Sequence, residues 1–135
     1  MTVLIVDGQG GRLGKQLVKE VLERFPGQEV LAVGTNSMAT ESMIKAGAPR
    51  AATGENAVVV ACRKADVILG PVGIVIADAL LGEVTPAMAK AVGQSDAIRI
   101  LLPSDKCSTI VAGVGSQSMS ALIDDAMNRL AEIVK

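Results

Sequence analysis

The stretch Gly8-Gln9-Gly10-Gly11-Arg12-Leu13-Gly14 lies between an apolar run, residues 3–6, and an amphipathic segment, residues 13–25. This order of strand, glycine turn and helix is typical of the first unit of a nucleotide-binding α/β domain. Glycines let backbone amides approach a pyrophosphate, and the N-terminus of the following helix favours its negative charge. The stretch therefore predicts a phosphate-binding turn, although it identifies no reaction.

Composition excludes several classes of function. The 135 residues predict a single domain over residues 1–135, with a core that is almost entirely aliphatic because Phe25 is the only aromatic residue. The net charge of −1 and the lack of stacking aromatics argue against a nucleic-acid partner. No apolar run reaches the length of a bilayer span and the sequence begins directly with a strand, so we expect a cytoplasmic protein without membrane contact. Cys62 and Cys107 do not form a metal-type pair, and no metal is expected.

Short apolar segments alternate with helical patterns along the chain, which predicts an α/β fold with a doubly wound, Rossmann-like parallel sheet in one three-layer domain. We expect six strands with the central order 3-2-1-4-5, and the first strand in the middle. They lie near residues 3–6, 30–33, 50–52, 67–69, 98–102 and 109–112.

Helices are expected between these strands. They cover residues 13–25, residues 40–46 with Gly47 as the C-terminal cap, a segment that starts at the N-cap Thr85 and Pro86, and residues 119–134. Residues 56–64 contain Val58-Val59-Val60, which suits a strand, but a helix fits the alternation better.

The predicted strand order reverses between the first and fourth strands, and ligands bind at such a point, beyond the carboxyl ends of the strands. The glycine turn and the turn Gly70-Pro71-Val72-Gly73 would meet there. The predicted ligand-binding residues are Gly8, Gln9, Gly10, Gly11, Arg12, Leu13, Gly14, Thr35, Asn36, Ser37, Gly70, Pro71, Val72 and Gly73.

The spacing Gly8-x-x-Gly11-x-x-Gly14 resembles the glycine loop of extended short-chain dehydrogenases and their NmrA-like relatives. The resemblance implies that Gly8 makes the tight turn, that Gly11 approaches the pyrophosphate and that Gly14 allows close helix–strand packing. A side chain at Gly11 would then block the ligand and leave the fold intact, whereas one at Gly14 would also harm folding. The chain contains no Tyr, so the catalytic Tyr of that family is absent and only cofactor binding is implied. A tight turn without a ligand is the alternative.

The residues after the second strand bear on the type of cofactor. NAD sites usually place an acidic residue there to bind the ribose, whereas this chain has Thr35, Asn36 and Ser37. Arg12 could meet a 2′-phosphate, so NADP is favoured over NAD. Arg12 is equally well explained as a solvated side chain at the start of a helix.

A second pattern also fits in part. Residues 9–16 can be aligned with the P-loop pattern, but Gln9 stands at its first glycine and Gln16 replaces its Ser or Thr. Asp7 precedes the loop and would repel phosphate unless a cation intervened. The simpler expectation is that Asp7 accepts hydrogen bonds from the loop amides.

The other polar residues do not assemble into a set of nucleophile, base and orienting group. Asp78 lies in an apolar segment and either faces the crevice as an acid or base or points to solvent, whereas Glu83 is expected to be solvated surface. Cys107, next to Lys106, is either a thiol of lowered pKa or a packing residue.

The whole chain resembles a small uncharacterised bacterial family with a Rossmann-like appearance, catalogued as a domain of unknown function. The resemblance rests on residues 6–11, 53–57, 70–74, 77–78 and 82–86. It implies a bacterial cytoplasmic protein and supplies no activity.

Three functions remain open. The first is a small nucleotide- or dinucleotide-binding protein, with an NAD(P)-type ligand and no evident redox catalysis. The second is a phosphate-handling or NADP-linked enzyme that uses Asp7, Asp78 or Lys15, and the third is a ligand-free interaction protein. Because the apolar content is high for a small chain, we expect a homo-oligomer, at least a dimer.

Overall fold

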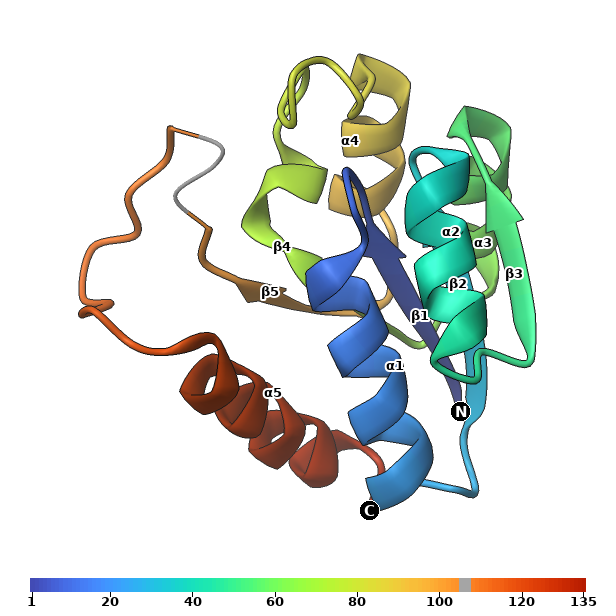
Figure 1. Ribbon diagram of the computed structural model, residues 1–135, viewed down its shortest axis with the longest axis vertical. Coiled ribbons are helices and arrows are strands. Elements are labelled where there is room, and N and C mark those ends of the chain that lie inside the picture. The colour runs from blue at the N-terminus through green and yellow to red at the C-terminus, as the bar shows by residue number, and fades with distance from the viewer. Residues whose placement is uncertain (105–107) are drawn as a thin grey trace.

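The computed structural model describes residues 1–104 and 108–135, and these form one five-stranded parallel sheet (Figure 1). The strand order β3-β2-β1-β4-β5 confirms the doubly wound arrangement and the central position of the first strand. The strands are β1 (Thr2–Asp7), β2 (Glu29–Gly34), β3 (Arg50–Thr53), β4 (Val67–Pro71) and β5 (Ile98–Leu102).

Helices cover both faces of the sheet (Figure 1). On one face lie α1 (Arg12–Arg24), α2 (Ser37–Lys45) and α5 (Met119–Ile133), and on the other lie α3 (Glu55–Lys64) and α4 (Pro86–Gly93), together with the short 3-10 helix η1 (Val72–Val75). The segment with the three valines is therefore helix α3, as the alternation of strands and helices favours.

The central strand explains why the core forms. Val3 and Ile5 point into the cluster under α1 and α5, whereas Leu4 and Val6 point into the cluster under α3 and α4. A strand that is covered on both faces needs a continuous apolar run, and residues 3–6 supply one.

Local signals place two of the helix ends. Thr85 accepts a hydrogen bond from the Met88 amide at 3.1 Å, and Pro86 occupies the first helical position of α4. Gly47 follows α2 with a φ of +111°, the left-handed region expected of a C-terminal cap.

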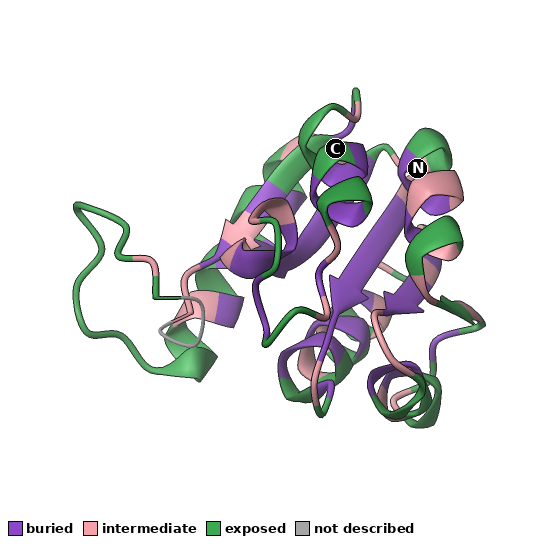
Figure 2. Ribbon diagram, turned by 90° about the horizontal axis from the view of Figure 1, so that it is seen from above, coloured by how far each residue is buried: buried purple, intermediate pink, exposed green. Residues whose placement is uncertain are grey.

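The expected sixth strand, residues 109–112, is wrong. These residues adopt no strand, and the side chain of Ile110 is 96% exposed. Residues 110–118 are exposed and run outside the body of the fold (Figure 2). A β-prone sequence forms a strand only where it pairs with a neighbour and buries one face, and this segment does neither.

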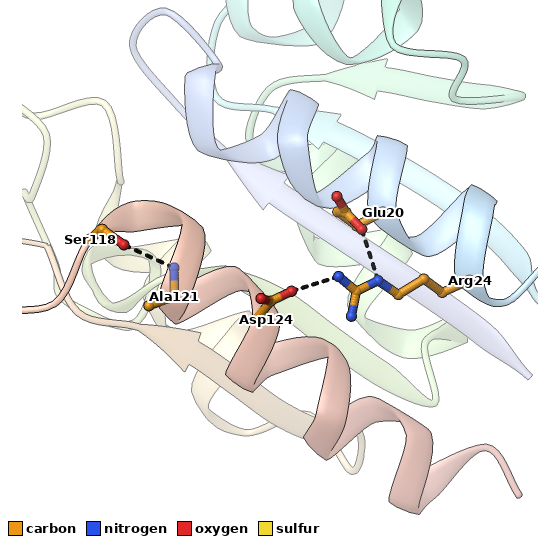
Figure 3. Close-up of polar contacts among 5 residues, drawn as sticks. All are labelled: Glu20, Arg24, Ser118, Ala121 and Asp124. Atoms are coloured by element: carbon orange, nitrogen blue, oxygen red, sulfur yellow. Dashed lines mark hydrogen bonds and ion pairs between the residues drawn. The ribbon is translucent and has the colours of Figure 1, made fainter.

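Helix α5 returns the chain to the sheet and packs against α1 (Figure 3). Ser118 caps its N-terminus by accepting a hydrogen bond from the Ala121 amide at 3.1 Å. The guanidinium of Arg24 joins the two helices, because its Nη2 lies 2.6 Å from Asp124 and its Nε lies 2.8 Å from Glu20. This exposed contact joins the last turn of α1 to the second turn of α5.

Candidate functional site

A cavity of about 260 Å³ lies beside the glycine turn, at the point where the strand order reverses between β1 and β4. Strands β1 and β4 end there, at Asp7 and Pro71, so this is the position expected for a ligand in an open parallel sheet. The cavity is lined by Asp7, Gly8, Gln9, Gly10, Gly11, Arg12, Leu13, Gln16, Pro71, Leu80, Ser104 and Met119.

Asp7 holds the glycine turn together. Its side chain is buried, and its two carboxylate oxygens accept hydrogen bonds from the Gly8 amide at 2.8 Å and the Gly14 amide at 2.7 Å. The expectation that Asp7 binds loop amides is confirmed. These two amides are consequently committed to the protein itself.

Gly14 and Gly11 are both required by packing. A Cβ at Gly14 would lie 2.7 Å from the Asp7 Cβ and 2.7 Å from the Met43 sulfur, which confirms the close helix–strand approach expected there. Gly11 has a φ of +73°, and a Cβ on it would lie 2.9 Å from both the Cα and the carbonyl oxygen of Ala39 in α2. The expectation that a side chain at Gly11 leaves the fold intact is therefore wrong, because the turn abuts the backbone of a second helix.

Three other amides of the loop remain available. Within residues 1–104 and 108–135, the N–H groups of Gly10, Arg12 and Leu13 donate no hydrogen bond, and α1 has no side-chain cap. The side chain of Arg12 is exposed at the cavity and forms no ion pair with the described residues. Free amides and a cation at a helix N-terminus are the groups that bind a phosphate.

Glu83 was expected at the solvated surface, and this expectation is wrong. One carboxylate oxygen, Oε1, accepts hydrogen bonds from the Gln9 amide at 2.8 Å, the Thr35 hydroxyl at 2.7 Å and the Asn36 side-chain amide at 2.7 Å. Glu83 thus joins the glycine turn to the end of β2. No local signal around Gly82-Glu83 marks this role, because its partners lie 48 and 47 residues away at Thr35 and Asn36 and 74 residues away at Gln9.

The surroundings of Glu83 keep it charged. Burial raises the pKa of its carboxyl, but the hydrogen bonds from Gln9, Thr35 and Asn36 together outweigh burial and lower the pKa below its ordinary value. A fixed negative charge therefore lies at the end of β2, where the sequence itself has no acidic residue.

Of the remaining predicted site residues, some line the cavity and others do not. Pro71 lines the cavity with the glycine turn, so the two turns do meet, whereas Gly70, Val72 and Gly73 are not among the lining residues. A Cβ on Gly70 would overlap the carbonyl oxygen of Val6, which assigns Gly70 a packing role. Thr35, Asn36 and Ser37 do not line the cavity either: Thr35 and Asn36 bind Glu83, and Ser37 is exposed at the start of α2.

Asp78 and Cys62 do not line the described cavity. Asp78 is exposed in a turn and not on a helix. Cys62 is buried, and burial raises the pKa of its thiol to about 11. Cys107 and its neighbour Lys106 lie outside the described residues. Among the residues described, no group of three or more His, Cys, Asp or Glu side chains could hold a metal ion, and no helix has the length and apolarity for a membrane span.

The chain belongs to the family described as Domain of unknown function (DUF3842), whose model matches residues 2–135. This match agrees with the resemblance of the whole chain to an uncharacterised family. No curated protein matches the chain. The family description names no activity.

Proposed function

We propose that this member of an uncharacterised family binds a small phosphate-bearing ligand of the nucleotide type in the cavity beside the glycine turn. The observation that carries the proposal is the set of three amides at the wall of that cavity, on Gly10, Arg12 and Leu13, that donate no hydrogen bond within the described part of the chain. A phosphate there would accept hydrogen bonds from these amides and from the guanidinium of Arg12.

The position of the cavity supports the same function. It lies outside the carboxyl ends of β1 and β4, and the N-terminus of α1 borders it. Asp7 also borders the cavity and places a negative charge near the proposed phosphate, although two amides already bind its oxygens. Binding is therefore to be measured with and without Mg²⁺, which would offset the charge of Asp7.

Isothermal titration calorimetry with pyrophosphate, AMP, ATP, GTP, NAD and NADP tests the proposal. We expect at least one of them to bind, and Arg12→Ala to weaken that binding about ten- to a hundredfold, since a hydrogen bond to a charged group contributes about 1.5–3 kcal/mol. Arg50→Ala is the matched control, because Arg50 is also exposed but begins β3, at the opposite end of the sheet. An absence of binding by all six ligands at millimolar concentration, with and without Mg²⁺, would refute the proposal.

A second candidate, catalysis of phosphate transfer, has less support. Asp7 is the only carboxylate in the described cavity lining, and its oxygens are engaged by Gly8 and Gly14. Asp78 lies outside that lining. Lys15 is exposed and is also outside it. Binding without turnover is therefore the function that the geometry favours.

A further inference from the structure

The loop of residues 76–85 covers one side of the glycine turn. It connects η1 to α4, and it is closed by a hydrogen bond from the Asp78 amide to the Val84 carbonyl at 2.7 Å. Two of its side chains lie against Gly8: a Cβ on Gly8 would be 2.8 Å from Leu80 Cδ1 and 3.0 Å from Glu83 Oε1. The space directly above Gly8 is therefore filled by the protein.

Glu83 also accepts hydrogen bonds from the polar groups at the end of β2. The Gln9 amide, the Thr35 hydroxyl and the Asn36 side-chain amide all donate to the same oxygen, Oε1. In Rossmann domains the end of the second strand is where the ribose of a dinucleotide is bound. Thr35 and Asn36, the uncharged side chains that the sequence offers to such a ribose, are bound instead to Glu83.

The backbone of the loop shows that this arrangement is enforced. Asp78, Leu80 and Leu81 have φ angles of +67°, +57° and +57°, in the left-handed region that residues other than glycine rarely adopt. Such strain persists only where surrounding contacts hold it in place. The burial of Leu80 and the three bonds to Glu83 supply these contacts.

The cavity itself lies away from Glu83 and the end of β2, since neither Glu83 nor residues 35–37 line it. Beyond the glycine turn it is lined by Pro71 at the end of β4, Ser104 after β5 and Met119 at the start of α5, and not by residues 35–37. Its volume of about 260 Å³ is smaller than the 300–1,000 Å³ that is usual for drug-sized ligands.

We infer that Glu83 excludes the ribose of a dinucleotide from the end of β2, so that the ligand is a compact phosphate ester extending from the glycine turn toward Pro71, Ser104 and Met119. The inference rests on the proposed function, because it presumes a phosphate at the turn. It makes Glu83 a residue that determines specificity by occupying a ligand subsite.

Calorimetry with AMP, NAD and NADP on the wild type and on Glu83→Ala tests this. The wild type is expected to bind AMP at least tenfold more tightly than either dinucleotide. Glu83→Ala frees the three donors and removes the charge, so its affinity for NAD and NADP should rise at least tenfold, while its affinity for AMP stays within about threefold of the wild type. A carboxylate that instead bound the ribose directly would give the opposite result, a loss of NAD affinity.

Two further variants distinguish exclusion of the ribose by Glu83 from a general disturbance of the loop of residues 76–85. Glu83→Gln keeps a carbonyl oxygen at the same place, so it should still accept from Thr35 and Asn36 and still bind dinucleotides weakly. Asp78→Asn removes an exposed carboxylate from the same loop and should bind all three ligands as the wild type does. Circular dichroism and thermal melts establish that each variant is folded.

The outcomes distinguish this inference from the proposed function. If the wild type binds AMP and NAD equally well, or if folded Glu83→Ala binds NAD no better, the inference is overturned and the proposed function stands. Should Glu83→Ala fail to fold, the ratio of AMP to dinucleotide affinity in the wild type still decides. If none of the phosphate ligands binds, both fail together.

Discussion

Replacing Asp7 by Asn tests how the glycine turn is held. The two oxygens of Asp7 accept hydrogen bonds from the amides of Gly8 and Gly14, and the side chain is only 5% exposed. Asparagine has one oxygen and one NH₂ group, so in either orientation one buried amide faces a donor and loses its acceptor.

The size of the effect follows from these contacts. A hydrogen bond to a charged group contributes about 1.5–3 kcal/mol, and a buried donor that loses its partner incurs a penalty of similar size. Asp7→Asn removes one such bond and should lower the free energy of unfolding by about 1.5–3 kcal/mol, whereas Asp7→Ala removes both and should lower it by about 3–6 kcal/mol. Since domains are stable by only about 5–15 kcal/mol, the alanine variant is expected to be close to unfolding.

Urea denaturation followed by circular dichroism gives the measurement, with the two-state slope compared among variants. Asp96→Asn is the control, because Asp96 is exposed in the turn before β5 and makes no hydrogen bond or ion pair within the described residues. Its effect should remain within about 0.5 kcal/mol. The reasoning is refuted if Asp7→Asn is as mild as Asp96→Asn, because the carboxylate would then not be essential to the turn.

Four further predictions concern the packing, the titrating groups and the assembly. Gly14→Ala should lower the urea midpoint markedly and Gly10→Ala should not, because a Cβ at Gly14 lies 2.7 Å from the Asp7 Cβ whereas one at Gly10 meets no atom within 4 Å; equal midpoints would contradict this. Burial raises the pKa of the Cys62 thiol to about 11. In a Cys107→Ser background this thiol should therefore react with Ellman's reagent at pH 8 only as fast as the protein opens. A burst of rapid reaction would instead show an accessible thiol. The pKa of Glu83 is lowered in the folded state, so its charge stabilises the fold above the ordinary pKa of 4.5, and this stabilisation is lost as the pH falls through the lower folded pKa. The difference in melting temperature between the wild type and Glu83→Gln should therefore shrink below about pH 4.5. A difference that does not depend on pH would contradict this. Light scattering at micromolar concentration should show at least a dimer, because several large apolar side chains are exposed, and a monomer would count against it.

The sheet could be predicted from the sequence because its determinants are local. An apolar run such as residues 3–6 has the composition of a strand that is buried on both faces, and alternation with helical patterns then restricts the connections to right-handed parallel crossovers. The central position of β1 and the order of all five strands match the common doubly wound order, which these rules allow. Residues 109–112 show the limit of the same rules, since a β-prone composition does not show whether a neighbouring strand is within reach.

The role of Asp7 could also be predicted, because its partners are near in the sequence. A carboxylate at the end of a strand lies within reach of the amides of the turn that follows, and Gly8 and Gly14 are one and seven residues away. The packing role of Gly14, the third residue of α1, is implied by the resemblance of the glycine spacing to a known loop. The constraint on Gly11 escaped prediction because it comes from Ala39 in α2, an element whose position depends on the sheet as a whole.

Glu83 shows most clearly what local reasoning misses. The preference for NADP over NAD depended on the absence of an acidic residue after β2. The sequence has no acidic residue directly after this strand, but the fold places Glu83 at its end. The loop after β4 brings a carboxylate to Thr35 and Asn36 from 48 and 47 residues away, so the negative charge that would oppose a 2′-phosphate is present after all. Its three hydrogen bonds also occupy the groups on which a ribose would depend.

Glycine substitutions in the turn cannot resolve the identity of the ligand, because at Gly8, Gly11 and Gly14 they disturb packing first. Arg12 and Glu83 are the informative positions. The side chain of Arg12 is exposed at the cavity and forms no ion pair within residues 1–104 and 108–135, whereas Glu83 lies outside the cavity lining and binds the end of β2.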